Sequence, residues 1–233
     1  MSRNAVGYEM NKPFRLAKRA LAIVVMFVLS SLPIMARAQQ GSHVDVLTVN
    51  GTIDPWTSGY IDRGIGTAER DGAQALIVVL NTPGGTLGAM QKITTRMLNA
   101  RVPVVVFVYP TGAGAGSAGT FILMAANLAA MAPGTTVGAA HPIDASGQDI
   151  PSDARTKEIN YAASMIQGIA EQRGRNADWA VRAVQESIAA TAQEALDQNV
   201  IDLIATDLSD LVNKLDGRVV LTVAGILGGF FVF

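Results

Sequence analysis

The chain has 233 residues, 49% of them hydrophobic, and a formal net charge of −1. This length allows one sizeable core, and the near-zero charge provides no basic field for nucleic acid. The absence of cysteine excludes disulfides, thiol nucleophiles and thiolate metal ligands. With only two histidines, His43 and His141, a zinc site built on several imidazoles is not expected either.

The N-terminal segment has the organisation of an export signal. Three basic residues precede the apolar run 20–35, and the small-x-small motif Ala36-Arg37-Ala38 follows it. The run is shorter than the roughly twenty residues that a bilayer span needs. We therefore predict that residues 1–38 are a signal peptide, with a retained membrane anchor as the alternative. Either one places the rest of the chain on the extracytoplasmic (in a Gram-negative cell, periplasmic) side.

The segment 39–215 alternates between strand-like and helix-like stretches. Valine-rich or continuous apolar runs predict strands at 44–51, 75–80, 102–110 and 200–206, with further short strands within 128–138. Apolar residues at helical spacing predict helices at 57–72, 87–100, 119–127 and 154–174. This order predicts one α/β domain with mostly parallel, buried strands.

Three residues mark helix boundaries in the second half of the chain. Asn176 is a candidate N-cap. Thr191 and Glu194 have the spacing of a capping box. Asn199 follows the short helix that this box begins and is suited to a left-handed closing conformation.

Two further segments differ in composition from the α/β part. The stretch 141–153 is polar and rich in turn residues, which predicts an exposed loop. The tail 216–233 ends in an apolar run. Its sequence is compatible with a short or truncated membrane segment, a buried strand or an altered tail.

Two glycine-rich stretches follow predicted strands: "TPGG" at 82–85 and "TGAGAGSAG" at 111–119. Because sites in such sheets form at the carboxyl ends of strands, we expect the two to be neighbours in space. The second contains the G-x-G-x-x-G spacing of dinucleotide sites. Residues 72–142 contain no Asp or Glu, however, so the acid that would hold a ribose is missing. The sequence argues against nucleotide binding and predicts that the glycines turn the chain tightly from strand into helix.

Ser117, inside the second glycine stretch, is a candidate nucleophile, and a serine needs a base to take its proton. A histidine triad is not expected, because the first glycine of G-x-S-x-G is missing here. No carboxylate lies between Ser117 and His141, so the order serine, acid, histidine of such a triad is not present. His43 lies near the expected start of the mature chain, where chain ends are usually loose.

Lysine is the remaining common base for a serine nucleophile, once burial has lowered its pKa. Beyond residue 38 the chain has three lysines. Lys92 faces away from the apolar stripe of its helix, and Lys214 lies near the C-terminal end beside an acid. Lys157 opens a long helix directly after the polar loop and is the best candidate by elimination. An ordinary exposed lysine, paired with a neighbouring acid, stays open as the alternative.

Acyl transfer also needs donors for an oxyanion. Gly84 and Gly85 can bring bare backbone N–H groups close to a carbonyl, and the N–H of Ala118 would be the second donor. The alternative is that these glycines only permit tight turns.

Several motifs together resemble the NfeD-type membrane-bound serine proteases of the ClpP/crotonase superfamily. They are "LNTPGG", "VYPTGAGAGSAGTFILMAA", "MAPGTTVGAAHPI", "RGRNADWA" and "TAQEALDQNVIDLIA", and the resemblance covers roughly residues 42–212. It implies a β-β-α superhelical fold and endopeptidase activity through a Ser–Lys dyad. Position by position, it implies Ser117 as nucleophile, Lys157 as general base, and Gly84 or Gly85 with Ala118 at the oxyanion hole. It also implies an association with stomatin-like membrane proteins.

Our hypothesis from the sequence is an exported or membrane-tethered serine endopeptidase that needs no metal or cofactor. Extended apolar peptides would bind by β-strand addition, and self-association as a dimer or larger assembly is expected. One alternative is a crotonase-like acyl-thioester enzyme, which would want a carboxylate near the site and a coenzyme A pool; the sequence predicts neither. The other is a non-catalytic membrane scaffold that binds a stomatin-like partner.

Overall fold

A parallel sheet forms the centre of the chain in the computed structural model, which describes residues 43–142, 152–223 and 225–227. Its five strands lie in the order β1-β2-β3-β5-β8, and every neighbouring pair is parallel. The strands are β1 (Val44–Asn50), β2 (Ala75–Asn81), β3 (Val104–Val108), β5 (Leu128–Met131) and β8 (Leu203–Ile204). The predicted α/β class with parallel, buried strands is confirmed.

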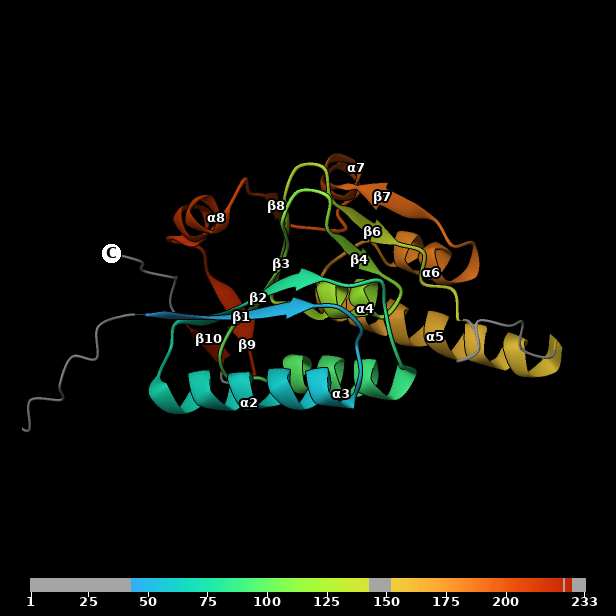
Figure 1. Ribbon diagram of the computed structural model, residues 1–233, viewed down its shortest axis with the longest axis horizontal. Coiled ribbons are helices and arrows are strands. Elements are labelled where there is room, and N and C mark those ends of the chain that lie inside the picture. The colour runs from blue at the N-terminus through green and yellow to red at the C-terminus, as the bar shows by residue number, and fades with distance from the viewer. Residues whose placement is uncertain (1–42, 143–151, 224, 228–233) are drawn as a thin grey trace, which may run out of the picture. The chain divides into compact units, whose positions relative to one another are not determined.

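Helices cover both faces of this sheet. The helices α2 (Pro55–Asp71) and α3 (Leu87–Leu98) lie along one face, and α8 (Leu208–Leu215) lies on the other (Figure 1). Alternate side chains of one strand enter separate cores, as the period of two in a strand requires. Leu76 and Val78 belong to the larger core with α2 and α3, whereas Ile77 belongs to the smaller core that α8 closes.

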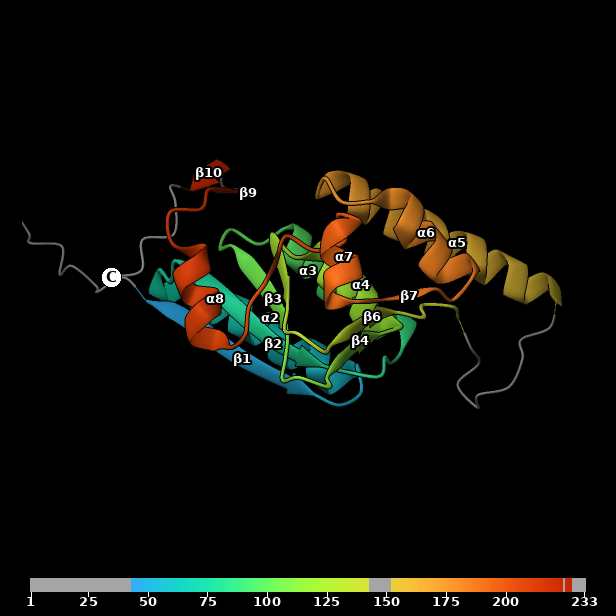
Figure 2. The ribbon, with the colours of Figure 1, turned by 90° about the horizontal axis from the view of Figure 1, so that it is seen from above.

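The remaining helices lie between β3 and β8 in the chain. They are α4 (Ala118–Ala125), α5 (Ser152–Gln172), α6 (Ala177–Gln185) and α7 (Ala192–Asp197). Long α5 and short α6 lie side by side (Figure 2). Their apolar faces join the larger core, so that α5 and α6 extend it beyond the sheet.

The predicted helix boundaries are confirmed. The Asn176 side chain accepts a hydrogen bond from the N–H of Trp179 at the start of α6. Thr191 and Glu194 form both halves of the capping box that begins α7. Asn199 has φ of 56°, the left-handed conformation expected there.

Two elements near the C-terminal end differ from the prediction. The strand expected over 200–206 is reduced to the two residues of β8, because this edge strand pairs only with the last two residues of β5. The helix α8 was not predicted. Its signals were present in the sequence: the Asp207 side chain caps it by accepting from the Asp210 N–H, and Leu211 and Leu215 share its buried face.

A small second sheet carries the glycine-rich stretch. Its strands are β4 (Gly114–Gly116), β6 (Thr136–Gly138) and β7 (Ala189–Thr191), with β4 parallel and β7 antiparallel to β6. Three residues of the stretch that was predicted to turn from strand into helix are thus a paired strand, and the turn into the helix α4 falls at Ser117. The segment is extended because it finds hydrogen-bonding partners in β6.

The described part of the tail is a hairpin of β9 (Val220–Thr222) and β10 (Gly225–Leu227), which pair antiparallel. Within the described residues, no helix is both long enough and apolar enough to cross a membrane. The predicted signal segment 1–38, most of the polar loop 141–153 and the end of the tail lie outside the described residues.

Two arginines after α5 hold the end of α4, the helix that starts beside Ser117. Arg175 is buried, and its Nη1 donates to the carbonyls of Met124 and Ala126 at 2.9 and 2.8 Å. Its Nη2 is ion-paired with Asp202. Arg173 donates to the Ala125 carbonyl at 2.8 Å. Burial, and then the charge of Arg175, lowers the pKa of Arg173 to about 10.

The buried Arg175 ion pair makes a stability prediction. We expect Arg175→Met to lower the free energy of unfolding by about 3 kcal/mol, the lower end for breaking a buried pair, because Asp202 keeps part of its surface in water. Urea denaturation measures the change. The control is Arg182→Met, which breaks an exposed pair with Glu186 and should cost less than about 1 kcal/mol. Equal losses in the two variants would contradict the assignment.

Candidate active site

Ser117 occupies the turn between β4 and α4, at the N-cap position of the helix. Its φ of 49° and ψ of −113° are unusual for a residue with a side chain, and such strain gathers at functional sites. A serine at this position ordinarily accepts a hydrogen bond from its helix. The Ser117 side chain makes no such bond. The hydroxyl is therefore presented at a strained strand-to-helix turn, the arrangement of a nucleophile elbow.

The loop after β2 lies directly against this turn. Thr82 and Ala115 pair in a parallel β-bridge. The Thr82 N–H donates to the Gly114 carbonyl at 2.8 Å, and the Gly116 N–H donates to the Thr82 carbonyl at 3.0 Å. These bonds confirm the prediction that the two glycine-rich stretches are neighbours in space.

Glycines are needed here because the two backbones approach so closely. A Cβ at Gly84 would lie 2.6 Å from the Ser117 Cβ, and Gly84 also has φ of +127°. A Cβ at Gly116 would lie 3.0 Å from the Pro83 carbonyl oxygen. The glycines make room between the loops, and Ser117 itself makes the sharp turn.

The structure separates the candidate oxyanion donors. The Gly84 N–H donates to the Thr82 hydroxyl at 3.0 Å and is occupied. The N–H groups of Gly85 and Ala118 donate to none of the described residues, and both residues line one pocket with Ser117. Of the two glycines that the sequence left open, Gly85 is the one with a free N–H.

This serine pocket is small and mainly apolar. It has a volume of about 120 Å³. Besides Gly85, Ser117 and Ala118, its walls are Leu87, Met90, Phe121, Ala140, Pro142, Glu158 and Ala162. Glu158 contradicts the sequence expectation that no carboxylate would be near the site. The sequence already associated the start of α5 with Ser117 through Lys157, and the adjacent residue Glu158 is the one that lines the pocket.

Lys157 is exposed, and it is not among the residues that line the serine pocket. The structure thus unites Ser117, Gly85 and Ala118 but leaves Lys157, the next residue to Glu158, outside the pocket. The other two lysines differ in environment. Lys92 is exposed, as predicted. Lys214 bonds to the Asp210 carboxylate at 2.8 Å, one turn earlier in α8.

Neither histidine lines the serine pocket. The His141 Nδ1 lies 2.9 Å from the Val184 carbonyl oxygen, and His43 precedes β1 at the amino end of the sheet, beside Asp45. The backbone of His43 is held by the Gln74 N–H and is not loose. Across the described ranges, no three His, Asp or Glu side chains gather closely enough to hold a metal ion.

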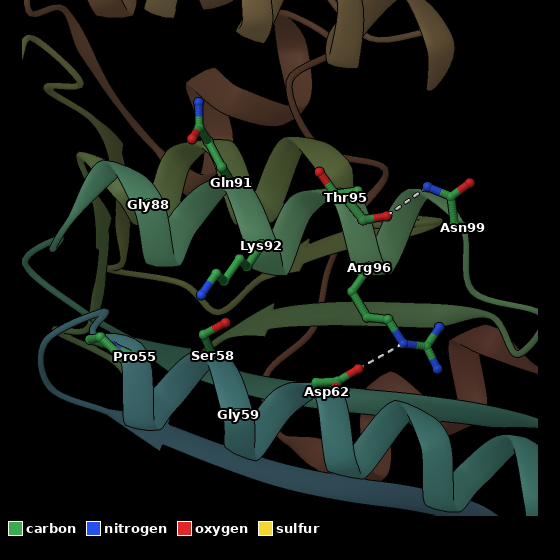
Figure 3. Close-up of a pocket in the computed structure, with 10 residues that line it drawn as sticks. All are labelled: Pro55, Ser58, Gly59, Asp62, Gly88, Gln91, Lys92, Thr95, Arg96 and Asn99. Carbon is green, nitrogen blue, oxygen red and sulfur yellow. Dashed lines mark hydrogen bonds and ion pairs between the residues drawn. The ribbon is translucent and has the colours of Figure 1, made fainter.

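A larger groove, of about 740 Å³, lies between α2 and α3 and contains another serine and lysine. Lys92 extends from α3 toward the side of α2 that carries Ser58 (Figure 3). Ser58 lies inside a helix, where its N–H already bonds to the Asp54 carbonyl at 2.9 Å. Helical N–H groups of this kind cannot serve as oxyanion donors. The larger groove therefore lacks the features that single out the Ser117 pocket.

An ion-pair network closes one end of this groove. Arg96 bonds to Asp62 at 2.9 Å (Figure 3) and to Glu69 at 2.8 Å. Burial alone would raise the pKa of Glu69. Hydrogen bonds from Arg96 and from the Arg101 N–H outweigh burial, so the pKa lies below its usual value. This network joins α2 to α3 and carries no reactive group.

The family model of the NfeD1b N-terminal domain matches residues 43–219, which is most of the chain. The chain belongs to this NfeD1b family. It is 37% identical over 201 residues to the membrane-bound protease PH1510 of Pyrococcus horikoshii, covering 86% of this chain and 45% of that protein. It is 26% identical to the membrane protein NfeD1b of Bacillus subtilis, covering 83% of this chain and 46% of that protein. This NfeD1b-family chain thus spans less than half the length of these relatives.

Solved structures of the 1510-N membrane-bound stomatin-specific protease resemble this NfeD1b-family chain. A serine-to-alanine variant matches with a TM-score of 0.73 and 37% identity, covering 78% of this chain and 89% of the other. A lysine-to-alanine variant in complex with a substrate peptide matches with a TM-score of 0.75 and 35% identity. This match covers 82% of this chain and 89% of the other. ClpP1 from Listeria monocytogenes matches with a TM-score of 0.57 and 19% identity, covering 71% of this chain and 94% of the other. The predicted ClpP-like fold is confirmed.

The close approach at Gly84 can be tested by two matched substitutions. Gly84→Ala adds a methyl group against Ser117, whereas Gly51, with φ of +124°, has open space around its Cβ position. Both variants carry similar backbone strain. We expect Gly84→Ala to lower the free energy of unfolding by about 1–3 kcal/mol more than Gly51→Ala, which is the cost of overpacking. Urea denaturation of both checks this, and equal losses would mean that the loops are not tightly packed.

Proposed function

We propose that this NfeD1b-family chain is a serine endopeptidase with Ser117 as its nucleophile. One observation carries the proposal: the strained Ser117 turn presents an uncapped hydroxyl in a mainly apolar pocket, beside the N–H groups of Gly85 and Ala118, which donate to none of the described residues. A nucleophile with adjacent oxyanion donors is the arrangement that acyl transfer needs.

In the proposed reaction the Ser117 Oγ attacks a peptide carbonyl while Lys157, as the neutral amine, takes the hydroxyl proton. The N–H groups of Gly85 and Ala118 stabilise the negative oxygen of the tetrahedral intermediate. The C–N bond then breaks, and Lys157 returns the proton to the leaving amine. A water molecule attacks the resulting acyl-enzyme, with Lys157 again as base, and releases the acid and free Ser117.

The role of Lys157 requires it to enter the pocket from its exposed position on α5. Two observations support it as the base. Glu158, its neighbour, already lines the serine pocket, so this turn of α5 borders the site. In the 1510-N protease, the serine and the lysine replaced in the two variants are separated by nearly the same length of chain as Ser117 and Lys157.

For the substrate we propose extended apolar peptide segments. The pocket walls formed by Leu87, Met90 and Phe121 suit an apolar side chain, and binding of the extended peptide backbone by β-strand addition is part of the proposal. Because the 1510-N relative is described as stomatin-specific and membrane-bound, we propose a stomatin-like membrane protein as the substrate. Action at the extracytoplasmic face and self-association remain part of this proposal, on the sequence argument alone.

The two residues of the dyad provide a direct test. We expect Ser117→Ala and Lys157→Ala each to reduce kcat/KM for a fluorogenic apolar peptide by roughly a thousandfold or more, the usual scale for losing a nucleophile or its base. Ser58→Ala and Lys92→Ala are the matched controls, because this second serine and lysine share the α2–α3 groove. The controls should keep wild-type activity.

The other outcomes would reject one residue of the dyad or favour one of the alternative functions. Cleavage that survives Lys157→Ala would reject Lys157 as the base, and cleavage that survives Ser117→Ala would reject the nucleophile. If the wild type cleaves no apolar peptide but still binds a stomatin-like protein, the scaffold alternative is correct. Turnover of an acyl-thioester that depends on Glu158 would favour the crotonase-like alternative instead.

A further inference from the structure

A buried hydroxyl beneath the Ser117 turn has no part in the reaction described above. Thr120 lies in α4, and its relative exposure is 0%. A threonine inside a helix commonly bonds back to a carbonyl of its own helix. The Thr120 Oγ1 instead lies 2.9 Å from the Ala115 carbonyl oxygen in β4 and 3.0 Å from the Gly138 carbonyl oxygen in β6.

The same hydroxyl also accepts a hydrogen bond. The Gly138 N–H donates to the Thr120 Oγ1 at 3.1 Å. A hydroxyl has one proton, so it donates to one of the two carbonyls at a time and accepts from the N–H. All three of these partners are backbone groups of β4 and β6. This single side chain ties α4 to two strands of the small sheet.

Gly138 is in turn the residue that holds the nucleophile. The Ser117 N–H donates to the Gly138 carbonyl at 3.0 Å, and the Thr120 N–H donates to the Ser117 carbonyl at 2.9 Å. Both backbone groups of Ser117 are thus fixed by Gly138 and Thr120. A strained conformation such as that of Ser117 persists only where its surroundings over-determine it.

We propose that Thr120 is a positioning residue, whose hydroxyl fixes the Gly138 peptide and thereby keeps Ser117 in its strained, reactive conformation. The inference rests on the proposed function, because it needs Ser117 as the nucleophile. Thr120 does not line the serine pocket, so it acts through Ser117 and not on the substrate.

The test compares Thr120→Val, which removes the hydroxyl at nearly constant shape, with Thr120→Ser, which restores a hydroxyl. Thr94→Val in α3 is the matched control. Thr94 is also a buried helical threonine, at 2% exposure, but its hydroxyl bonds to the Gln91 carbonyl of its own helix at 3.2 Å. The full chain is used throughout. The readouts are the rate of covalent labelling of Ser117 by a fluorophosphonate probe, kcat and KM for an apolar peptide, and thermal unfolding.

For Thr120→Val we expect labelling rate and kcat to fall roughly 10- to 100-fold with little change in KM, since small misplacement of a reacting group costs this much. Thr120→Ser should restore most of the lost labelling rate and kcat, and Thr94→Val should be labelled at the wild-type rate. Rates are measured well below each unfolding midpoint. Thr120→Ala replaces Thr120→Val if the valine variant does not fold.

Three results would overturn the inference while the proposed function stands: wild-type labelling in Thr120→Val, no recovery in Thr120→Ser, or an equal loss in Thr94→Val. The last of these would mean that any lost buried hydroxyl slows the reaction through stability. If the wild type itself is not labelled at Ser117, the proposed function fails and this inference fails with it. The two failures are therefore distinguishable.

Discussion

The parallel pairing of Thr82 with Ala115 is the contact on which the site depends. It brings the loop that follows β2 against the strand that precedes Ser117, so that donors and nucleophile from distant parts of the sequence share one pocket. Two backbones can lie this close only where side chains are missing, which is why glycines occupy both sides. Burial of the main sheet fixes where each loop begins, and this pairing fixes where the loops meet.

Much of this arrangement could be predicted from sequence because its causes are local. A continuous apolar run such as 75–80 predicts a buried strand, and the chain direction of parallel strands then places "TPGG" and Ser117 at the same edge of the sheet. The caps at Asn176 and Thr191 depend on side chains within three residues, and they too were predicted. The helix α8 has an equally local signal in the cap at Asp207 and the helical spacing of Leu211 and Leu215, which is sufficient to predict it.

The remaining features depend on contacts between distant segments. The glycine-rich stretch becomes the strand β4 because β6, about twenty residues later, and Thr82, at the end of β2, supply partners. The pocket wall from α5 shows another limit. Adjacent helical residues point about 100° apart around the axis. The sequence therefore indicates that this turn of α5 borders the site, but it does not show whether Lys157 or Glu158 faces the pocket. The structure places Glu158 there.

The arginines that hold the end of α4 have an electrostatic consequence for the other end of that helix. A helix carries partial negative charge at its C-terminal carbonyls and partial positive charge at its first N–H groups. Arg173 and Arg175 place two cations on the carbonyls of residues 124–126, where they neutralise the negative pole. The positive pole, at Ala118, is left open toward the pocket. The short helix therefore acts as an oriented dipole that favours negative charge beside Ser117.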